Sequence, residues 1–421
     1  MAPMAAEDDA IRDEALAWLR EHWNPELRVR DWWTLLAESG WGFPSWPRDR
    51  FGRGLRAEQA AAVRDAFRDV GAIGPPGSLG QRLGGPTLLT HARREILDQF
   101  LPELAYGREY WCQYFSEPGA GSDLAGLQTR AVRDGDEWIV NGQKVWTSGA
   151  QFADRGMLLA RTDPDAPKHQ GLTYFIIDLD QPGIEVRPLH QMNDAHGFNE
   201  TFFTDARVSH DRIVGQLNGG WSVALTTLMY ERGGGAVPSA HPGKRLAMLD
   251  MQVGEVIAGR ERGEREGLGM SAIAPTVMNV ARELERETDP VVRQRLAELY
   301  AMEETLRLGG LRSTSARRTG EGPGPGGSVG KIARSNLSRL TREVGMEVLG
   351  ATGMLVGPTT PGNGKLQHAA LSAPGSSIAG GTDEIQHNII GERVLGLPKE
   401  PRLDADLPFR EIKTGTQSRP D

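Results

Sequence analysis

The spacing of apolar residues changes twice along this 421-residue chain, and that change is what most constrains its fold. Up to about residue 110, apolar residues recur every three or four positions, as they do in amphipathic helices. From about residue 111 to 215 they alternate with polar residues or form short runs between turn residues, which is typical of β-strands. After residue 220 the helical spacing returns. This order predicts a mainly α protein with a central β domain.

The same pattern predicts four segments, which are a helical domain over 1–110, a β domain over 111–215, a helical domain over 216–398 and a loose polar tail over 399–421. Within the β domain, Asn141-Gly142 is typical of a hairpin turn between strands over 137–140 and 144–147. Further strands are expected over 156–160, 172–179, 184–188 and 201–208. The expected helices lie over 11–19, 32–40, 57–70, 90–104, 221–228, 296–308 and 332–349.

Charge and cysteine usage exclude several classes of protein. The 48 basic and 56 acidic residues give a net charge of −8, which argues against a nucleic-acid binder because such proteins neutralise phosphates. The single cysteine, Cys112, excludes an internal disulfide and a cysteine-rich zinc site. No apolar run is long enough for a membrane span, and the first residues lack the features of a signal peptide. We therefore expect a cytoplasmic protein that does not act at a membrane.

Two short motifs resemble catalytic signatures but lack the context those signatures need. Residues 322–327 match G-x-G-x-x-G, and residues 326–330 match G-x-S-x-G around Ser328. A dinucleotide loop or a nucleophile elbow must follow a strand, whereas residues 312–319 are polar and basic. We interpret the segment as a helix connector with Ser328 as an N-cap, and a serine hydrolase is the weaker alternative. The nine histidines are scattered, and no metal site is expected.

Three separated stretches are more informative. Residues 115–123 read FSEPGAGSD, and their small side chains let backbone N–H groups approach a flat heterocycle or a phosphate. Residues 141–148 read NGQKVWTS, which places a large aromatic ring beside two hydroxyls. Residues 378–386 read IAGGTDEIQ, and glycines there lead into a helix start that suits an anionic group. Each stretch by itself also has a purely structural interpretation: the first as a tight turn, the second as a core tryptophan and the third as a capped helix.

Together and in this order, the three stretches resemble the acyl-CoA dehydrogenase family over residues 10–398. Further matching pieces are Phe198-Asn199-Glu200, Gly220-Trp221 and the segment GGTDEIQHNIIGERVLGLP. The resemblance implies an N-terminal helical domain, a β-barrel-like middle domain and a C-terminal four-helix bundle. It also implies FAD between the middle domain and the bundle, partly against a second subunit.

The resemblance carries site residues onto this chain. The implied cofactor-binding residues are Phe115, Ser116, Gly121, Ser122, Trp146, Thr147, Ser148, Arg265, Gly350, Gly353, Thr382 and Glu384. The implied substrate-binding residues are Ser122, Arg232, Gly380 and Gly381. Arg265 begins the nearest match to an R-x-x-F-G element, in which the family's arginine contacts FAD across subunits.

The catalytic base has to be a carboxylate in a dry, apolar pocket, because it removes a proton next to a thioester carbonyl. One branch of the family places this glutamate directly before a Gly-Thr pair, where this chain has Gly380. Another branch, which includes isovaleryl- and long-chain-type enzymes, places it in a Leu-x-x-Glu-Arg pattern on the helix after Gly-Trp. The segment from Leu228 to Arg232 fits that pattern and assigns the base to Glu231. The alternative is a surface glutamate paired with Arg232.

The resemblance therefore implies FAD-dependent α,β-dehydrogenation of an acyl-CoA thioester in lipid or fatty-acid metabolism, with electrons passing to an electron-transfer flavoprotein. The thioester could be carried by CoA or by an acyl-carrier protein. A homodimer or homotetramer is expected, and a heteromer is possible. The alternatives are a non-catalytic or half-site partner subunit of a heteromeric dehydrogenase, and a flavin oxidase or monooxygenase with the same fold.

Overall fold

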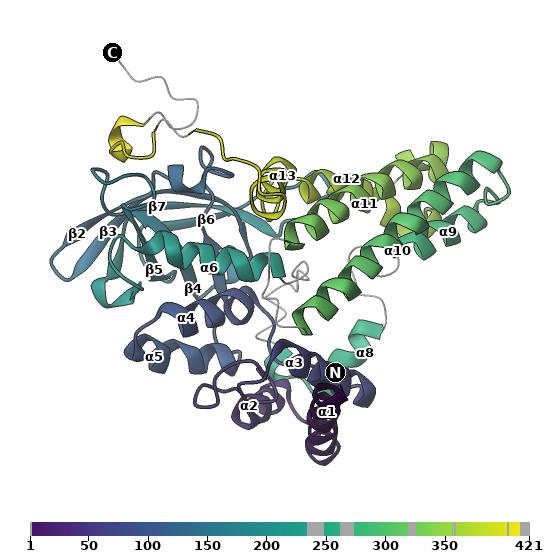
Figure 1. The fold of residues 1–421 in the computed structure, drawn as a ribbon, viewed down its shortest axis with the longest axis horizontal. Helices are drawn as coiled ribbons and strands as arrows, with labels where there is room; N and C mark the ends of the chain where they lie inside the picture. The colour runs from purple at the N-terminus through teal and green to yellow at the C-terminus, as the bar shows by residue number, and fades with distance from the viewer. Residues whose placement is uncertain are drawn as a thin grey trace. The chain divides into compact units, whose positions relative to one another are not determined.

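The structure is a computed structural model that describes residues 2–233, 248–261, 273–318, 326–355, 357, 359–401 and 404–412 (Figure 1). The chain divides into two compact units. The first unit comprises Met1–His190, His196–Gly259 and Pro401–Asp421, and the second comprises Gln191–Ala195 and Arg260–Glu400. The N-terminal helices and the β domain thus form one unit rather than the two segments predicted, and that unit extends beyond residue 215.

The first unit begins with helices. Their bounds are α1 Ala2–His22, α2 Val29–Ser39, α3 Ala57–Val70, the π-helix η1 Gly80–Gly84, α4 Gly85–His91 and α5 Arg94–Ala105. The four helices predicted in this region are confirmed, although the one expected over 90–104 is two helices. On α2, Trp32, Trp33 and Leu36 share a buried face because they recur at helical spacing. Gly40, at φ 75°, ends that helix.

An eight-stranded sheet follows, with strand order β6-β7-β3-β2-β4-β5-β8 and with β1 paired in parallel to β4. Its strands are β1 Trp111–Tyr114, β2 Arg130–Asp134, β3 Glu137–Ser148, β4 Arg155–Arg161, β5 Leu172–Asp178, β6 Ile184–Pro188, β7 Phe198–Ser209 and β8 Ile213–Val214. The predicted hairpin turn at Asn141-Gly142 is wrong, because β3 runs straight through it along β7. The turn into β3 lies instead at Gly135-Asp136. A side chain at position 142 would place Cβ 2.5 Å from Thr129 Oγ1, so that close approach explains the glycine.

The sheet is buried on both faces at its centre. On one face, Leu159, Tyr174 and Ile176 pack with residues of η1, α4 and α5. On the other face, Leu158 and Phe175 pack with residues of β3 and β7. Helix α6 Gly220–Gly233 covers the first face, since its Val223 and Ala224 belong to the same cluster, and α8 Val253–Glu261 packs with α1 to α3. The contact of α6 with β5 is why the first unit continues beyond the last strand.

The second unit is a helical bundle. Its elements are α9 Ile273–Glu283, α10 Pro290–Arg318, α11 Gly326–Leu349, the 3-10 turn η5 Gly350–Met354, α12 Lys365–Ser376, α13 Asp383–Ile389 and the π-helix η7 Ile390–Val394. Buried Val277, Leu299 and Val344 join α9, α10 and α11 in one core. Ser328 lies inside α11 rather than at its N-cap, so that interpretation is wrong. Residues 319–325 lie outside the described residues, and the described residues on either side are helical, so no described strand precedes Ser328.

Part of the tail is ordered against the first unit. Pro408 forms an antiparallel bridge with Pro167, and the backbone N–H of Phe409 donates to the Ala166 carbonyl at 3.0 Å. The prediction of a loose tail is therefore wrong for residues 404–412.

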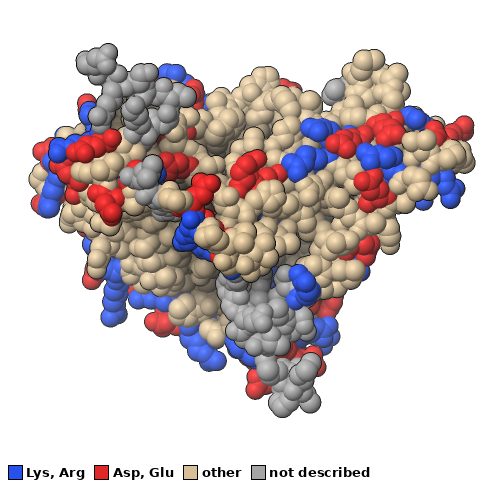
Figure 2. Space-filling view, turned by 45° about the horizontal axis from the view of Figure 1, so that its top comes forward, with Lys and Arg blue, Asp and Glu red and all other residues tan. Residues whose placement is uncertain are grey.

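Charges of both signs are interspersed over the face seen in Figure 2, without a single field of basic side chains. None of the helices among the described residues combines the length and the apolar composition needed to cross a membrane.

Candidate functional site

The loop that reads SEPGAGSD is held by a buried ion pair. The side chain of Glu117 accepts hydrogen bonds from the backbone N–H groups of Gln128 at 2.7 Å and Thr129 at 2.8 Å. Lys144, which is fully buried on β3, donates to Glu117 Oε1 and to the Phe115 carbonyl, both at 2.9 Å. Burial would raise the pKa of Glu117, but Lys144 and the other donors bring it below its usual range. One carboxylate thus fixes both ends of the loop to the sheet.

The loop and β3 are joined a second time next to the predicted site residues. The backbone N–H of Val145 donates to the Ser116 carbonyl at 2.9 Å. Ser116 is half-buried, whereas Gly121 and Ser122 are exposed. Phe115 is buried in the core, and its carbonyl accepts from Lys144.

Trp146 stands out on β3. Its backbone has φ 60°, which is unfavourable for any residue other than glycine, and its side chain is 60% exposed. The pairing with β7 is irregular between Lys144 and Thr147, and the indole packs edge-on against Phe198 with ring centroids 6.0 Å apart. A strained, exposed aromatic residue in a bulge is typical of a ligand contact.

The residues that follow Trp146 present polar atoms at the same bulge. Thr147 is buried, and its Oγ1 has no hydrogen-bond partner among the described residues. Asn199 on β7 is fully buried and donates to the Thr147 carbonyl at 2.9 Å. Ser148 is half-buried beside them. An exposed ring next to an unsatisfied hydroxyl fits a flat ligand with polar edges.

Helix α6 carries Glu231, and polar contacts fix the turn before it. Thr227 is buried, with its Oγ1 2.9 Å from Thr87 Oγ1 and 3.3 Å from the Tyr174 hydroxyl. Tyr174 in turn packs edge-on against Phe115, with ring centroids 5.9 Å apart. Glu231 is four residues after Thr227, so both lie on the same face of the helix. The contacts Phe115–Tyr174–Thr227 therefore link the start of the SEPGAGSD loop to the helix of the predicted base.

Glu231 is half-buried and has a cationic neighbour, Arg82 of the π-helix η1. Burial lowers the pKa of Arg82, and the Glu231 carboxylate opposes that shift. The interaction with Arg82 connects Glu231 to a buried part of the first unit, which argues against an isolated surface glutamate. The side chain of Arg232, the predicted partner in that alternative, lies outside the described residues.

In the second unit, the GGTDE segment turns sharply into α13. Gly380 and Gly381 have φ 66° and 87°, and a Cβ at position 381 would lie 2.6 Å from Gln386 Nε2. Thr382 is the N-cap of α13 and accepts from the Ile385 backbone N–H at 3.3 Å. Glu384, two residues after Thr382, is exposed. The hydroxyl predicted to contact a ligand thus also caps the helix.

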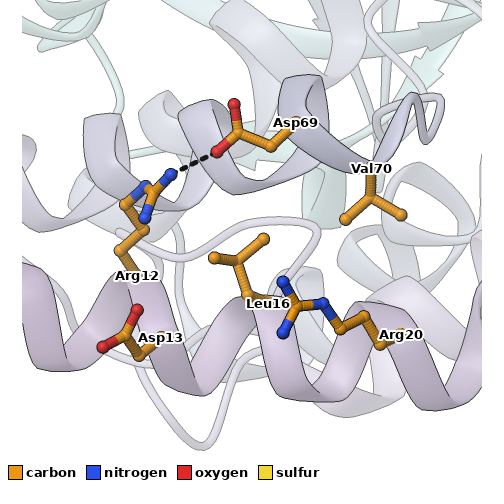
Figure 3. Close-up of a pocket in the computed structure, with 6 residues that line it drawn as sticks. All are labelled: Arg12, Asp13, Leu16, Arg20, Asp69 and Val70. Atoms are coloured by element: carbon orange, nitrogen blue, oxygen red, sulfur yellow. Dashed lines mark hydrogen bonds and ion pairs between the residues drawn. The ribbon is translucent and has the colours of Figure 1, made fainter.

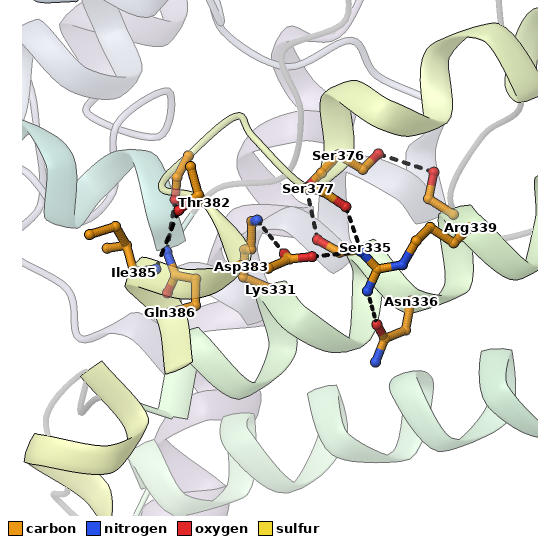
Figure 4. Close-up of polar contacts among 12 residues, drawn as sticks. Lys331, Ser335, Asn336, Arg339, Ser376, Ser377, Thr382, Asp383, Ile385 and Gln386 are labelled. Carbon is orange, nitrogen blue, oxygen red and sulfur yellow. Dashed lines mark hydrogen bonds and ion pairs between the residues drawn. The ribbon is translucent and has the colours of Figure 1, made fainter. Parts of the chain in front are cut away.

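Asp383 anchors this segment to α11 (Figure 4). It is 6% exposed and accepts hydrogen bonds from Lys331 Nζ and Arg339 Nη1, both at 2.8 Å. Arg339 Nη1 also donates to Ser377 Oγ at 2.8 Å. Burial would raise the pKa of Asp383, but these donors bring it well below its usual range. One carboxylate therefore joins the helix start, α11 and the end of α12.

The remaining predicted residues have mixed outcomes. Gly350, at φ 54°, and Gly353 lie in η5, and a Cβ at 353 would lie 2.6 Å from Met346 Cε. Arg265 lies outside the described residues.

A shallow pocket lies between α1 and α3, and an Arg12–Asp69 ion pair closes one side of it (Figure 3). The residues that line it are Arg12, Asp13, Leu16, Arg20, Asp69 and Val70. None of the predicted site residues lines that pocket.

Comparison with known proteins decides the family. The model of the acyl-CoA dehydrogenase middle domain matches residues 112–206, and that of the C-terminal domain matches residues 268–395. The chain is 36% identical over 389 residues to acyl-CoA dehydrogenase IpdE1 of Mycobacterium tuberculosis, with 91% of each chain covered. The chain belongs to the acyl-CoA dehydrogenase family. It is therefore an oxidoreductase that acts on a CH–CH group, and its family consists of flavoproteins.

Two similar structures are complexes of two named chains. The ChsE4–ChsE5 complex from Mycobacterium tuberculosis gives a TM-score of 0.67 at 28% identity, covering 94% of this chain and 98% of that chain. The Tcur3481–Tcur3483 steroid ACAD gives a TM-score of 0.69 at 27% identity, with the same coverage. The predicted fold class is confirmed by these neighbours.

Sequence reasoning missed several residues that hold the site together. Glu117, Lys144 and Asp383 lie inside the motifs, but they were read only as neighbours of the ligand-facing positions. A glutamate that precedes Pro-Gly and a lysine inside an apolar strand were signals of a buried pair. Nothing in the local sequence indicated the role of Arg82, because Arg82 and Glu231 are about 150 residues apart in the chain.

Proposed function

We propose that this enzyme carries out FAD-dependent α,β-dehydrogenation of a CoA thioester, with Glu231 as the catalytic base. The observation that carries the proposal is the chain of contacts Phe115–Tyr174–Thr227, which brings the SEPGAGSD loop and the helix of Glu231 together on one sheet. FAD would be held by Trp146, Thr147 and Ser148 in the first unit. Considered by itself, the second unit would offer its Thr382 segment to an FAD diphosphate. The exposed indole and the unsatisfied Thr147 hydroxyl support this assignment.

In the proposed mechanism, a carboxylate oxygen of Glu231 takes a proton from the carbon α to the thioester carbonyl. When bound, FAD would supply the acceptor for the hydride from the β carbon. Thr227 is held by Thr87 and Tyr174, which would fix the turn of α6 from which Glu231 extends. Ser122 and the exposed backbone around it would bind the thioester.

Arg82 should influence the pH dependence of the reaction. A guanidinium near Glu231 favours the ionised carboxylate, which is the form that accepts a proton. Replacing Arg82 by Gln removes that charge, so the pH at which activity is half lost on the acid side should move upward. The measurement is the pH profile of kcat/KM for the wild type, Arg82→Gln and the surface control Arg94→Gln. An acid limb that stays in place in Arg82→Gln would contradict the proposed pairing.

Asp383 should control how tightly FAD binds. Asp383→Asn leaves Lys331 and Arg339 without their buried carboxylate, so the GGTDE segment should lose its fixed position. We expect the dissociation constant for FAD to rise about tenfold or more, a change of about 1.4 kcal/mol or more. The measurement is a fluorescence titration of the apoprotein with FAD, and Glu343→Gln on the exposed side of α11 is the control. An unchanged dissociation constant would remove this role from Asp383.

We further propose a bulky, ring-containing acyl group and a second, different chain in the assembly. The support is that two similar structures are each named for two proteins, and that one of these is a steroid ACAD. Exposed apolar side chains on the second unit also fit burial against another chain, and they are Ile378, Val394, Leu395 and Leu397. Electrons would pass to an electron-transfer flavoprotein, as is expected for the family. A homodimer or homotetramer is the alternative assembly.

The decisive experiment is the visible spectrum and flavin content of the purified chain, alone and co-expressed with a candidate partner. Flavin near one per chain, bleached by CoA thioesters of steroid-derived acids more readily than by straight-chain ones, would support the whole proposal. Bleaching by straight-chain substrates alone would overturn the acyl-group assignment. Rapid re-oxidation by oxygen would favour an oxidase or monooxygenase. A colourless chain that gains no flavin with or without a partner would overturn the catalytic assignment and favour a non-catalytic subunit.

A further inference from the structure

Residues Asp404–Ile412, which we call the C-terminal strap, lie beyond the part of the chain that the family models match. The strap runs along the connection between β4 and β5. Besides the bridge between Pro408 and Pro167, the Phe409 N–H donates to the Ala166 carbonyl and the Arg410 N–H donates to the Pro164 carbonyl, both at 3.0 Å. Three successive strap residues are therefore tied to that connection by backbone contacts.

The strap covers a buried arginine at the end of β4. Arg161 is only 4% exposed, and its guanidinium carbon lies 3.4 Å from the centre of the Phe409 ring. The same guanidinium donates to the carbonyls of Ala125 at 2.6 Å and Leu127 at 3.3 Å. A guanidinium held between two carbonyls and an aromatic ring fixes all of these groups relative to one another. Phe409 thereby acts, through Arg161, on the segment that directly follows Ser122.

A lysine makes a second connection between the strap and the loop. Lys168 Nζ lies 3.2 Å from both carboxylate oxygens of Asp123 and 3.6 Å from Asp404 of the strap. The carboxylates are well exposed, so water and salt weaken this link. The Lys168 carbonyl, in turn, accepts from Arg161 Nη1 at 3.2 Å. The buried Arg161–Phe409 contact is thus the stronger of the two connections.

These contacts complete the fixation of the SEPGAGSD loop. The Glu117–Lys144 pair holds the loop at its start and at Gln128 and Thr129, where the chain returns to the sheet. Arg161 and Lys168 hold the residues in between, from 123 to 127. The exposed Gly121 and Ser122 lie between the two sets of contacts. If residues 123–127 become more mobile, the position of Ser122 should therefore be the first to change.

We propose that the C-terminal strap is a positioning segment for the thioester-binding loop: it covers Arg161 and so keeps residues 122–127 in the conformation that receives the CoA thioester. This inference rests on the proposed function, which assigns the thioester to Ser122. The strap reaches residues 123–127 through Arg161 and Lys168. Its effect should therefore appear in substrate binding rather than in the chemical step.

The test compares the full-length flavoprotein with Phe409→Ala, Phe409→Leu and the control Arg410→Ala. Arg410 lies on the same strap, but its ion pair with Asp165 is exposed on both sides and should contribute little. In Phe409→Ala we expect amide hydrogen exchange in residues 124–128 to be faster by about tenfold, within the range for a partly desolvated cation–π contact. KM for the CoA thioester should rise by a similar factor. The flavin content and kcat should stay within about twofold of the wild type.

Unchanged exchange in residues 124–128 of a folded Phe409→Ala protein would overturn the inference. A fall in kcat at constant KM would overturn it as well, since it would place the effect in the chemical step. If Phe409→Ala does not fold, Phe409→Leu keeps an apolar side chain and removes only the aromatic face, so it should show a smaller rise in both readouts. Failure of the proposed function gives a different result, because the wild type would then show no turnover while the exchange experiment still reports on the strap.

Discussion

Glu231→Gln is expected to lower kcat by about three orders of magnitude while flavin stays bound, since general-base catalysis contributes about 10²- to 10⁴-fold. The amide has nearly the same shape as the carboxylate but cannot accept the α-proton. Helix α6 should stay in place, because Thr227 anchors it to Thr87 and Tyr174. The measurement is stopped-flow bleaching of the flavin absorbance at saturating thioester.

The matched control is Glu255→Gln on α8, where an amide oxygen can still accept the hydrogen bond that Glu255 receives from the Gln252 backbone. This variant should bleach at the wild-type rate. Bleaching at the wild-type rate in Glu231→Gln would instead transfer the role of the base to another residue.

Lys144→Met should destabilise the first unit by about 3–5 kcal/mol, the usual effect of removing one partner from a buried ion pair. It leaves Glu117 buried without its cation, and the SEPGAGSD loop loses the link between Phe115 and β3. All ten tryptophans lie at or before residue 221, so tryptophan fluorescence in a urea titration reports on the first unit alone.

The control for this variant is Arg130→Met on β2, whose side chain is exposed, and it should change the unfolding free energy by less than about 0.5 kcal/mol. A double-mutant cycle with Glu117→Gln isolates the interaction between the two side chains. The buried pair would be ruled out as an anchor of the loop if Lys144→Met unfolded within about 1 kcal/mol of the wild type.

The elements of the fold could be predicted where periodicity was strong. The helix over 57–70 was found because its apolar residues recur at helical spacing, and the strand at 172–179 because it is a short, mainly apolar run between turn residues. The Asn141-Gly142 hairpin failed because pairing of β3 with β7 along the whole strand overrides the local turn preference. Helix α12 was not predicted, and Pro374 and Gly375 near its end are residues typical of a loop.

The candidate site could be predicted only in part. The motifs located the residues that face a ligand, because a ligand demands particular atoms such as hydroxyls, an indole ring or an exposed backbone. The residues that support these ligand-facing residues are determined by contacts between segments that are distant in the sequence. Arg161 meets Phe409 about 250 positions later in the chain, and nothing local to either residue indicates the contact. The strap was therefore read as a loose tail, although it is a part of the first unit.

At Trp146, with its left-handed backbone, selection for stability and selection for flavin binding favour different residues. A tryptophan at φ 60° is about 1–2 kcal/mol less favourable than a glycine there, so glycine at this position would make the fold more stable. Under the proposed function the indole is kept because it packs on the flavin ring. A library of variants at position 146 that is screened for heat resistance without flavin should drift toward glycine or asparagine, and the same library screened for flavin retention should return to tryptophan.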